Sequence, residues 1–323
     1  MTTLLVASTG GHLKQLHQLH RRLTTVDGPY HWATFDTPQS RSLLADEHVT
    51  YVPFVGGRDP VNILRNVPRA ARILRAEKID TLVSTGSAVA LPFFAVARAR
   101  GLRCHYIESA ARSTGPSVTG GLMSRLPGVN RYAQYPAWAG DRWIYRGSVF
   151  DAYAPTSAAP AAMQGDGRAG VPINRAVVTL GTFKDIGFRR LVVRLLEILP
   201  PEVEVLWQTG DTDVSDLGIE GHHAIPEREL IDAMAAADVV VAHAGVGTAL
   251  AAMEVGRCPI LVPRRLAHGE HVDDHQIQIA DELGRRGLAL SVDADDLSLD
   301  DLTTAAAMRV ETLAQAPPFA TLA

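Results

Sequence analysis

Cysteine is scarce in this chain, which has only Cys104 and Cys258 among its 323 residues. Both lie in apolar stretches that are typical of buried strands, so we predict two unpaired core thiols in a reducing compartment. This scarcity excludes a disulfide framework and a metal site built from cysteines.

Long hydrophobic runs are also missing. The most apolar stretch, AVALPFFAVA at residues 88–97, is far shorter than the roughly 20 residues that cross a bilayer. The chain opens on Met1-Thr-Thr-Leu-Leu-Val-Ala without a basic leader, so we expect no targeting segment and a cytoplasmic protein. Such a protein can still contact the inner face of the plasma membrane through its surface.

Neither sign of charge is in large excess. The chain has 31 basic and 35 acidic residues, for a formal net charge of -4, and this balance predicts no nucleic-acid partner. Hydrophobic residues make up 46% and charged residues 20%, which is ordinary for a soluble globular protein. The length favours two domains.

The chain does contain a repeated alternation of apolar strands and amphipathic helices. Residues 3–7 predict a strand that ends in a glycine turn, and residues 13–23 predict the helix that follows. Helices at 37–45 and 59–77 have a proline in their first turn. The alternation restarts at residue 176. Such alternation indicates parallel sheets covered by helices on both faces.

One segment interrupts the alternation. Residues 154–172, APTSAAPAAMQGDGRAGVP, are rich in Ala, Pro, Gly and Ser and predict a linker. We therefore predict an α/β protein with two doubly wound Rossmann-like domains, at 1–153 and 173–323, facing a central cleft. Ligands of such sheets bind beyond the carboxyl ends of the strands, so the cleft is the expected site.

Three glycine turns lie where a strand passes into a helix. They are Gly10-Gly11, Gly181-Thr182 and Gly245-Val-Gly247-Thr248. Free N–H groups and the helix dipole favour an anion such as a diphosphate at such turns, although turns of this kind are also common in ordinary α/β proteins. None of the three matches a dinucleotide fingerprint or a Walker loop.

The densest group of polar residues runs from His243 to Gln276. It ends in GEHVDDHQ, residues 269–276. This segment resembles the donor half of family 28 glycosyltransferases, which include MurG, the catalytic subunit of the dolichol-pathway N-acetylglucosaminyltransferase and the split bacterial exopolysaccharide transferases. The N-terminal half resembles the partner subunit of the split enzymes at four places: Gly10-Gly11-His12, Ile107–Arg112, Pro116–Gly120 and Tyr145–Ser148. The chain thus resembles a single-chain fusion with the two-domain GT-B architecture.

The resemblance implies a UDP-sugar donor held by the second half. The residues expected to bind it are Gly181, Thr182, His243, Gly245, Gly247, Thr248, Glu254, Glu270, His271, Asp274, His275 and Gln276. Of these, Asp274, His275 and Gln276 are expected to face the transferred sugar. Relatives carry a ribose-binding Glu at the position of Ala251. Glu254, on the same helix face, either replaces it or is a solvated surface acid.

The same region could be mistaken for a metal site. The spacing of His271, Asp273, Asp274 and His275 matches no standard zinc motif, and Asp is a favoured cap where a helix begins. We find no convincing Asp-x-Asp motif. We therefore expect no metal and no cofactor, with backbone donors at the glycine turns stabilising the diphosphate.

The candidate for the catalytic base is His12. It follows the first glycine turn, and an imidazole titrates near neutral pH; alternatively, it only caps the helix or binds phosphate. Glu108 also ends a strand on that side and either orients His12 or is itself the base. Arg112 suits an acceptor phosphate, together with Gly10, Gly11 and Ser109, unless it forms a surface ion pair.

These expectations favour an inverting glycosyltransferase that extends a polyprenyl-diphosphate-linked saccharide for an exopolysaccharide or another cell-envelope glycan. One alternative is a UDP-sugar 2-epimerase, which shares the architecture but needs no lipid-linked acceptor. Another is a non-catalytic scaffold that recruits a separate transferase to the membrane, although recruitment would need only the N-terminal half.

Peripheral membrane contact is predicted for residues 114–127. This segment carries Val118, Leu122, Met123 and Leu126 and lies beside Arg112, with Arg125 inside it. An apolar edge beside basic residues can insert shallowly into a membrane. The alternative is a loop packed on its own domain.

Overall fold

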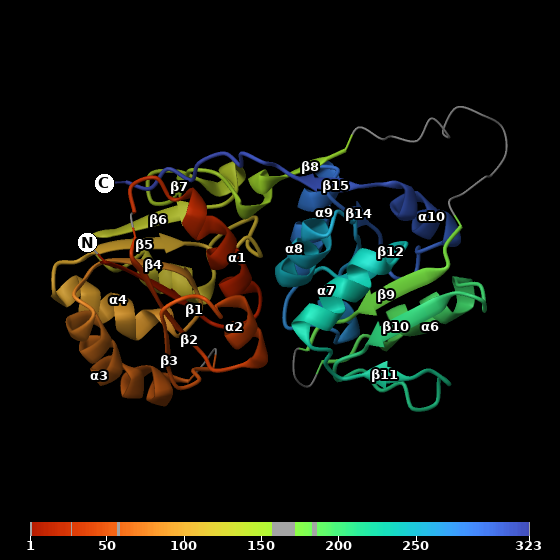
Figure 1. The fold of residues 1–323 in the computed structure, drawn as a ribbon, viewed down its shortest axis with the longest axis horizontal. Coiled ribbons are helices and arrows are strands. Elements are labelled where there is room, and N and C mark those ends of the chain that lie inside the picture. Colours follow the sequence, from red (N-terminus) through yellow and green to blue (C-terminus); the bar gives the residue numbers. More distant parts are fainter. Residues whose placement is uncertain (1, 27, 57–58, 157–171, 183–185, 323) are drawn as a thin grey trace. The chain divides into compact units, whose positions relative to one another are not determined.

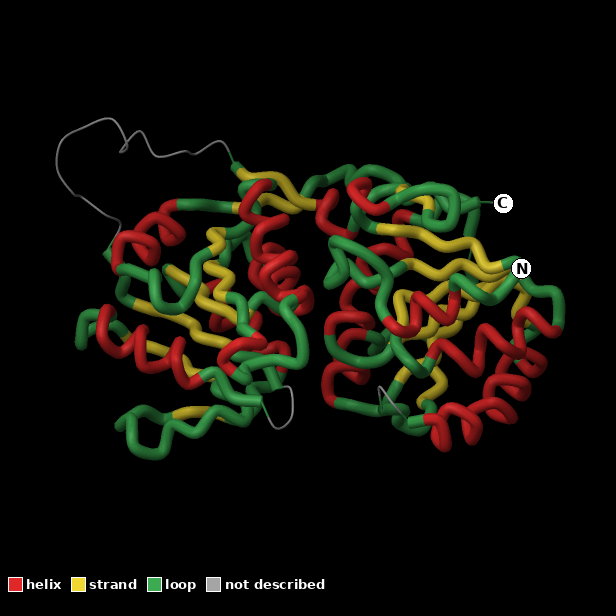
Figure 2. The backbone as a smooth tube through the Cα atoms, turned by 180° about the vertical axis from the view of Figure 1, so that it is seen from behind, coloured by secondary structure: helices red, strands yellow, loops and turns green. Residues whose placement is uncertain are grey.

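The computed structural model describes residues 2–322 except residues 27, 57–58, 157–171 and 183–185. The chain forms two compact units (Figure 1). The first comprises residues 1–151 together with 316–323, and the second comprises residues 152–315. In each unit, strands form a parallel sheet with helices on both sides (Figure 2).

The described strands of the first sheet run in the order β3-β2-β1-β4-β5-β6-β7, and every pair is parallel. The strands are β1 (Thr2–Ala7), β2 (Tyr30–Thr34), β3 (Val49–Tyr51), β4 (Ile79–Gly86), β5 (Arg103–Ile107), β6 (Val129–Ala133) and β7 (Ile144–Tyr145). The helices are α1 (Gly11–Leu19), α2 (Pro38–Leu43), α3 (Pro60–Ala76), α4 (Ala90–Ala99) and α5 (Val118–Met123), with 3-10 turns η1 (His20–Arg22), η2 (Pro136–Trp138) and η3 (Val149–Ala152).

Two helices of the first unit begin where the sequence predicts. The side chains of Thr37 and Asp59 each accept a bond from a backbone N–H of the first helical turn, and Pro38 and Pro60 follow them. Helices α3 and α4 bury apolar side chains against one face of the sheet. Helix α1 packs on β1 and β4 through buried leucines.

The second unit repeats this plan. Its described sheet has the parallel order β11-β10-β9-β12-β13-β14. The strands are β9 (Arg175–Thr179), β10 (Glu204–Gln208), β11 (Gly221–His222), β12 (Val239–His243), β13 (Ile260–Val262) and β14 (Leu290–Ser291), and β8 (Tyr153–Pro155) pairs separately with β15 (Val310–Thr312). The helices are α6 (Arg189–Ile198), α7 (Glu227–Ala236), α8 (Val246–Glu254), α9 (His275–Arg285) and α10 (Leu299–Ala307), with the turn η5 (Leu266–His268). Helices α6 and α10 cover one face of the sheet, and α7 and α8 the other.

The predicted boundaries differ from the structure at two places. Residues 316–323 belong to the first unit, not to the second, because Phe319 is fully buried there and Arg22 Nε donates to the Pro317 carbonyl at 2.8 Å. Ala154 and Pro155, predicted to open the linker, belong to β8. Most of the predicted linker, residues 157–171, lies outside the described residues.

Candidate active site

The strand order of the first sheet reverses between β1 and β4, the place where doubly wound sheets bind ligands. The loop after β1 passes through Gly10, whose φ of 84° suits glycine, and α1 then begins at Gly11. On this first turn, His12 Nδ1 lies 2.7 Å from the Thr85 carbonyl oxygen near the end of β4. A histidine thus bridges the two strands at the reversal.

The contact with Thr85 sets the tautomer of His12. A carbonyl oxygen only accepts, so Nδ1 carries the proton and Nε2 keeps a lone pair. Burial lowers the pKa of His12, and the positive charge of Arg112 lowers it further, against the opposing effect of the Thr85 carbonyl. At neutral pH His12 is therefore an uncharged imidazole with a basic Nε2.

A glycine and a tyrosine complete the surroundings of the His12 ring. A Cβ at Gly86, whose φ is 99°, would lie 3.2 Å from His12 Cε1 and 3.2 Å from the Tyr106 hydroxyl. The Tyr106 hydroxyl is buried, and among the described residues the Ser117 side chain interacts with it. No sequence pattern singles out Tyr106, Thr85 or Gly86.

Among the described residues, Glu108 makes its hydrogen bonds to the loop that follows it and none to His12. Its buried carboxylate accepts from the Ser109 N–H at 3.1 Å and from the Ser117 N–H at 3.0 Å. Burial raises its pKa, and these Ser117 and Ser109 bonds oppose the rise. Because His12 Nδ1 bonds to Thr85, the carbonyl and not Glu108 orients the imidazole. Glu108 instead holds the loop of residues 109–117.

Two buried glutamines fix the start of that loop. Gln15 Nε2 donates to Ser109 Oγ at 3.1 Å, and Gln15 Oε1 accepts from the Ala110 N–H at 2.8 Å. Gln134 Nε2 donates to Gln15 Oε1 at 3.1 Å and to the Glu108 carbonyl at 2.9 Å. Neither glutamine shows a sequence motif, because Gln15 bonds to residues 94 to 119 positions away and Gln134 to Glu108, 26 positions away. Ser109, predicted to bind the acceptor, is largely engaged in this network.

Arg112 follows at the end of the same turn and is partly exposed. Its backbone is fixed at both ends, because its N–H donates to the Ser109 carbonyl at 2.9 Å and its carbonyl accepts from Trp138 Nε1 at 3.1 Å. Its charge influences the pKa of both His12 and Glu108. The positive charge of Arg112 therefore acts on both His12 and Glu108.

The second unit has the same arrangement at its own strand reversal, between β9 and β12. His243 ends β12, and its Nδ1 lies 3.4 Å from the Thr179 carbonyl of β9. A Cβ at Gly181 would lie 2.6 Å from the ring, and one at Gly245 would lie 2.3 Å from its Nε2. Burial, followed by the charge of Arg264, lowers the pKa of His243 to about 3. A side chain at either position would clash with the neutral His243 ring. Glycine is therefore required at both positions, whatever ligand binds there.

Arg264 is a buried cation that the sequence analysis did not single out. It follows β13 and is 1% exposed. Its Nη2 donates to the Leu180 carbonyl at 2.7 Å, its guanidinium carbon lies 5.7 Å from the centre of the Phe188 ring, and its Nε lacks a partner among the described residues. Burial lowers its pKa to about 10, so it stays charged at neutral pH. A positive charge between the turns after β9 and β12 suits a diphosphate.

Gln276 and Glu270, both predicted donor ligands, hold the loop between β13 and α9. Gln276 Oε1 accepts from the Arg264 N–H at 3.0 Å. Buried Glu270 forms a two-pronged ion pair with Arg190 at 3.0 and 3.1 Å and accepts from the Arg265 N–H. Both Glu270 oxygens thus accept hydrogen bonds from the protein, which gives Glu270 a supporting role, and its contact with the donor stays a prediction. Arg190 lies some eighty residues earlier, so no local pattern could show this.

The ion pair extends to Asp293. Burial alone would raise the pKa of Asp293, but bonds from Arg190 and Arg265 lower it to about 2. The Arg190–Asp293 distance is 2.7 Å. This network ties α6 to the loop of residues 264–274 and rigidifies the support of the predicted donor site.

The polar run before α9 makes mostly internal contacts. Asp274 is the N-cap residue of α9, but its side chain accepts from the Leu266 N–H at 2.9 Å. Asp273 bonds to His275, and His271 packs edge-on against His275 at 4.7 Å. Ligand atoms of His271, Asp273 and His275 lie within 4.8 Å of one another, a closeness that the sequence spacing did not predict.

Helix α8 carries the remaining predicted donor residues. Gly247 and Thr248 lie in its first turn and are partly exposed, and Thr182 follows β9 after Gly181. Ala251 is buried in the cluster against α7, whereas Glu254 is exposed. Ala251 therefore packs against α7. Glu254 does not share the environment of Ala251.

The contacts of the second unit are made largely by residues within 176–314. This stretch matches the glycosyltransferase family 28 C-terminal domain. The second unit is a glycosyltransferase family 28 domain. The predicted family resemblance is thereby confirmed for this half.

Two curated relatives agree with this assignment. The chain is 28% identical over 311 residues to the UDP-N-acetylglucosamine–N-acetylmuramyl-(pentapeptide) pyrophosphoryl-undecaprenol N-acetylglucosamine transferase of Verminephrobacter eiseniae, covering 86% of this chain and 81% of that enzyme. It is 35% identical over 136 residues to the same transferase of Sorangium cellulosum, covering 37% of this chain and 33% of that enzyme. The second match thus spans about a third of the relative's length.

Solved structures show the fold over both units. MurG of Acinetobacter baumannii superposes with a TM-score of 0.54 at 20% identity, covering 94% of this chain and 89% of MurG. UDP-GlcNAc 2-epimerase of Methanocaldococcus jannaschii gives a TM-score of 0.57 at 11% identity, with 99% and 96% covered. The predicted GT-B fold and the glycosyltransferase class are confirmed.

Proposed function

We propose that this glycosyltransferase moves a sugar from a UDP-sugar to a polyprenyl-diphosphate-linked saccharide, with inversion, in the synthesis of an exopolysaccharide or another cell-envelope glycan. The match of residues 176–314 to the family 28 C-terminal domain carries the proposal. Relatives over both units are named for UDP-N-acetylglucosamine and an undecaprenol-linked acceptor. The reaction takes place on the cytoplasmic side of the membrane.

In the proposed reaction, the first unit activates the acceptor. His12 Nε2 accepts the proton of the acceptor hydroxyl, while the Thr85 carbonyl holds the opposite side of the ring. The Arg112 guanidinium binds an acceptor phosphate, since its planar fork matches phosphate oxygens. The loop that carries Arg112 is held by Glu108 and Gln15, so these two residues position the anion site.

The second unit stabilises the departing UDP. Backbone N–H groups at Gly181 and at the start of α8 meet the diphosphate, and at α8 the dipole of the helix N-terminus adds to their effect. The buried charge of Arg264 lies behind these turns. The chain's own donors thus supply the positive field that the leaving group needs, and we propose that no metal cofactor takes part.

Membrane contact is part of the proposal, and two exposed apolar features of the first unit support it. On α5, Val118 is 79% and Leu122 is 44% exposed. Phe54 and Leu64 are 68% and 69% exposed, and α3 continues from Leu64 into a face with exposed arginines. Exposed apolar side chains beside basic residues suit shallow contact with anionic lipid. None of the described helices is long and apolar enough to cross a bilayer.

The variant Leu122→Asp tests this contact. We expect it to reduce flotation of the protein with anionic liposomes and to reduce turnover on lipid-linked acceptor several-fold, because a charge replaces the inserted side chain. Leu196→Asp is the matched control, since Leu196 is 39% exposed on α6 of the second unit. Equal loss in both variants, or no flotation of the wild-type protein, would contradict the membrane contact.

The function itself is tested by incubating the protein with a panel of UDP-sugars, with and without polyprenyl-diphosphate-linked saccharide. We expect UDP release only when a lipid-linked acceptor is present, with one sugar strongly preferred. Interconversion of a UDP-sugar without acceptor would show a 2-epimerase. Absence of turnover, together with recruitment of another transferase to liposomes, would show a scaffold.

A further inference from the structure

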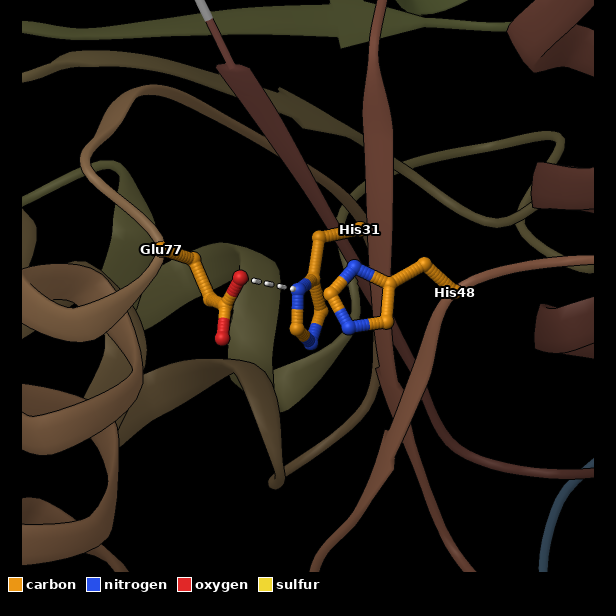
Figure 3. Close-up of side chains that lie close together, drawn as sticks. All are labelled: His31, His48 and Glu77. Carbon is orange, nitrogen blue, oxygen red and sulfur yellow. Dashed lines mark ion pairs between the residues drawn. The ribbon is translucent and has the colours of Figure 1, made fainter.

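A second cluster of ionisable side chains lies in the first unit, away from His12 and Glu108. His31 is the second residue of β2, His48 precedes β3, and Glu77 is the C-cap residue of α3. Figure 3 shows the two imidazole rings against each other, with the Glu77 carboxylate facing His31. These residues lie at the amino ends of the parallel strands, opposite the carboxyl ends that carry the proposed acceptor site. The proposed function uses none of them.

Three nitrogen and oxygen ligand atoms converge in this cluster. One ligand atom from each of His31, His48 and Glu77 lies within 4.8 Å of the other two. The ring centres of His31 and His48 are 4.0 Å apart. Two imidazoles and one carboxylate form the ligand set that zinc accepts in proteins.

His31 directs its Nδ1 toward Glu77. The residue is 0% exposed, and its Nδ1 lies 3.4 Å from Glu77 Oε2 without the geometry of a good hydrogen bond within the described residues. Its Nε2 lies 2.8 Å from Thr50 Oγ1. When Nε2 donates to that hydroxyl, the Nδ1 lone pair faces Glu77, and a neutral imidazole in this tautomer can bind a metal.

The distance between His31 and Glu77 favours an ion between them. His31 Nδ1 and Glu77 Oε2 are 3.4 Å apart. A charge-assisted hydrogen bond between such groups is shorter, at about 2.7–2.9 Å. Two ligand atoms bound at about 2.0–2.2 Å to a tetrahedral zinc ion lie about 3.3–3.6 Å apart. The observed separation therefore matches an edge of a zinc tetrahedron better than a direct ion pair.

We propose that His31, His48 and Glu77 bind a divalent transition-metal ion of the zinc class. Exposed His48 completes the set by a small rotation of its side chain, and water takes the fourth position. The ion joins three separate chain segments. It ties the edge strand β3, which pairs only with β2 in the described sheet, to the end of α3. Its role is to stabilise this edge of the sheet.

The test is zinc binding by the full chain. Zinc chloride is titrated by calorimetry into metal-free protein carrying His271→Ala, which removes the separate His271–Asp273–His275 group. In this background we expect one zinc ion to bind and the midpoint of thermal unfolding to rise. Adding His48→Ala or Glu77→Gln should weaken binding at least about tenfold and abolish the thermal shift, because each removes one ligand. Neither side chain is buried, so both variants should fold, as circular dichroism checks.

The matched control is His223→Ala. His223 lies 3.1 Å from Asp211 but belongs to no group of three ligands among the described residues, so its loss should leave zinc affinity unchanged. The proposal is overturned if the His271→Ala protein binds no zinc. It is equally overturned if His48→Ala and Glu77→Gln bind zinc as tightly as their parent.

Discussion

Replacing His12 by alanine lowers kcat by roughly 10²–10⁴-fold and leaves the affinity for UDP nearly unchanged, as expected for loss of a general base. The reason is that Nε2 is the only free nitrogen of a ring whose Nδ1 is bound to the Thr85 carbonyl. The measurement is initial-rate kinetics on lipid-linked acceptor, together with calorimetry of UDP binding.

Glu108 supplies the comparison for His12. Its carboxylate binds the Ser109 and Ser117 N–H groups, and glutamine keeps an acceptor oxygen for part of this set. We therefore expect Glu108→Gln to cost less than His12→Ala and to raise the KM for acceptor more than it lowers kcat. If Glu108→Gln stops turnover while His12→Ala keeps most of its activity, Glu108 is the base and the assignment of His12 is wrong.

The pH dependence of kcat/KM tests independently whether His12 is the base. Because burial lowers the pKa of His12, its neutral form persists below the usual value of about 6.5, and the acid limb of kcat/KM should lie below that pH. Arg112 also lowers this pKa. Arg112→Gln should therefore move the acid limb toward higher pH. An acid limb unchanged in both Arg112→Gln and His12→Ala would show that another group titrates.

The second large effect is expected at Gly245. A Cβ there would lie 2.3 Å from His243 Nε2, so Gly245→Val must displace the imidazole and the start of α8. We expect UDP affinity to fall at least about 100-fold, because displacement by about 1 Å disrupts precisely placed contacts on this scale. Gln276→Ala should cost less, on the order of 1 kcal/mol or fivefold for each lost hydrogen bond. Calorimetry with UDP measures both.

Two further variants separate a local clash from general unfolding. In Gly245→Ala with His243→Ala the ring is absent, so the fold should be as stable as in His243→Ala alone. Gly284→Ala is the control within the same unit, since its added Cβ would meet Ser291 Cβ at an ordinary 3.4 Å. Wild-type UDP affinity in both Gly245→Val and Gln276→Ala would remove the donor assignment.

Much of the fold could be predicted because its signals are local. Apolar strands, capping residues and first-turn prolines all act within a few residues, and α2 and α3 begin accordingly. The strand order is not local. It brings Thr85 to His12, and only the folded sheet shows which carbonyl orients the imidazole. The sequence therefore predicts the base but not its partner.

The supporting residues of both sites were hidden for a related reason. Glu270 carries a carboxylate that could bind a ligand, yet this carboxylate forms an ion pair with Arg190 of α6. Gln15 and Gln134 have no motif, because an amide in a helix or after a strand reveals its role only when its partner is known. Arg264 lies within the polar group that runs from His243 to Gln276, and only the fold shows that it is buried whereas Arg265 beside it is partly exposed.

The C-terminal residues that pack on the first unit determine the order in which the two units can finish folding. Thr25 Oγ1 donates to the Thr321 carbonyl at 3.0 Å, and Phe319 is fully buried beside Tyr132. Domains usually fold as they leave the ribosome, the N-terminal one first. Here the first unit lacks its last segment until residues 316–322, which follow the whole second unit in the chain, have been synthesised. The unit that is synthesised first is therefore the last to be finished, after residues 152–315 have had time to fold.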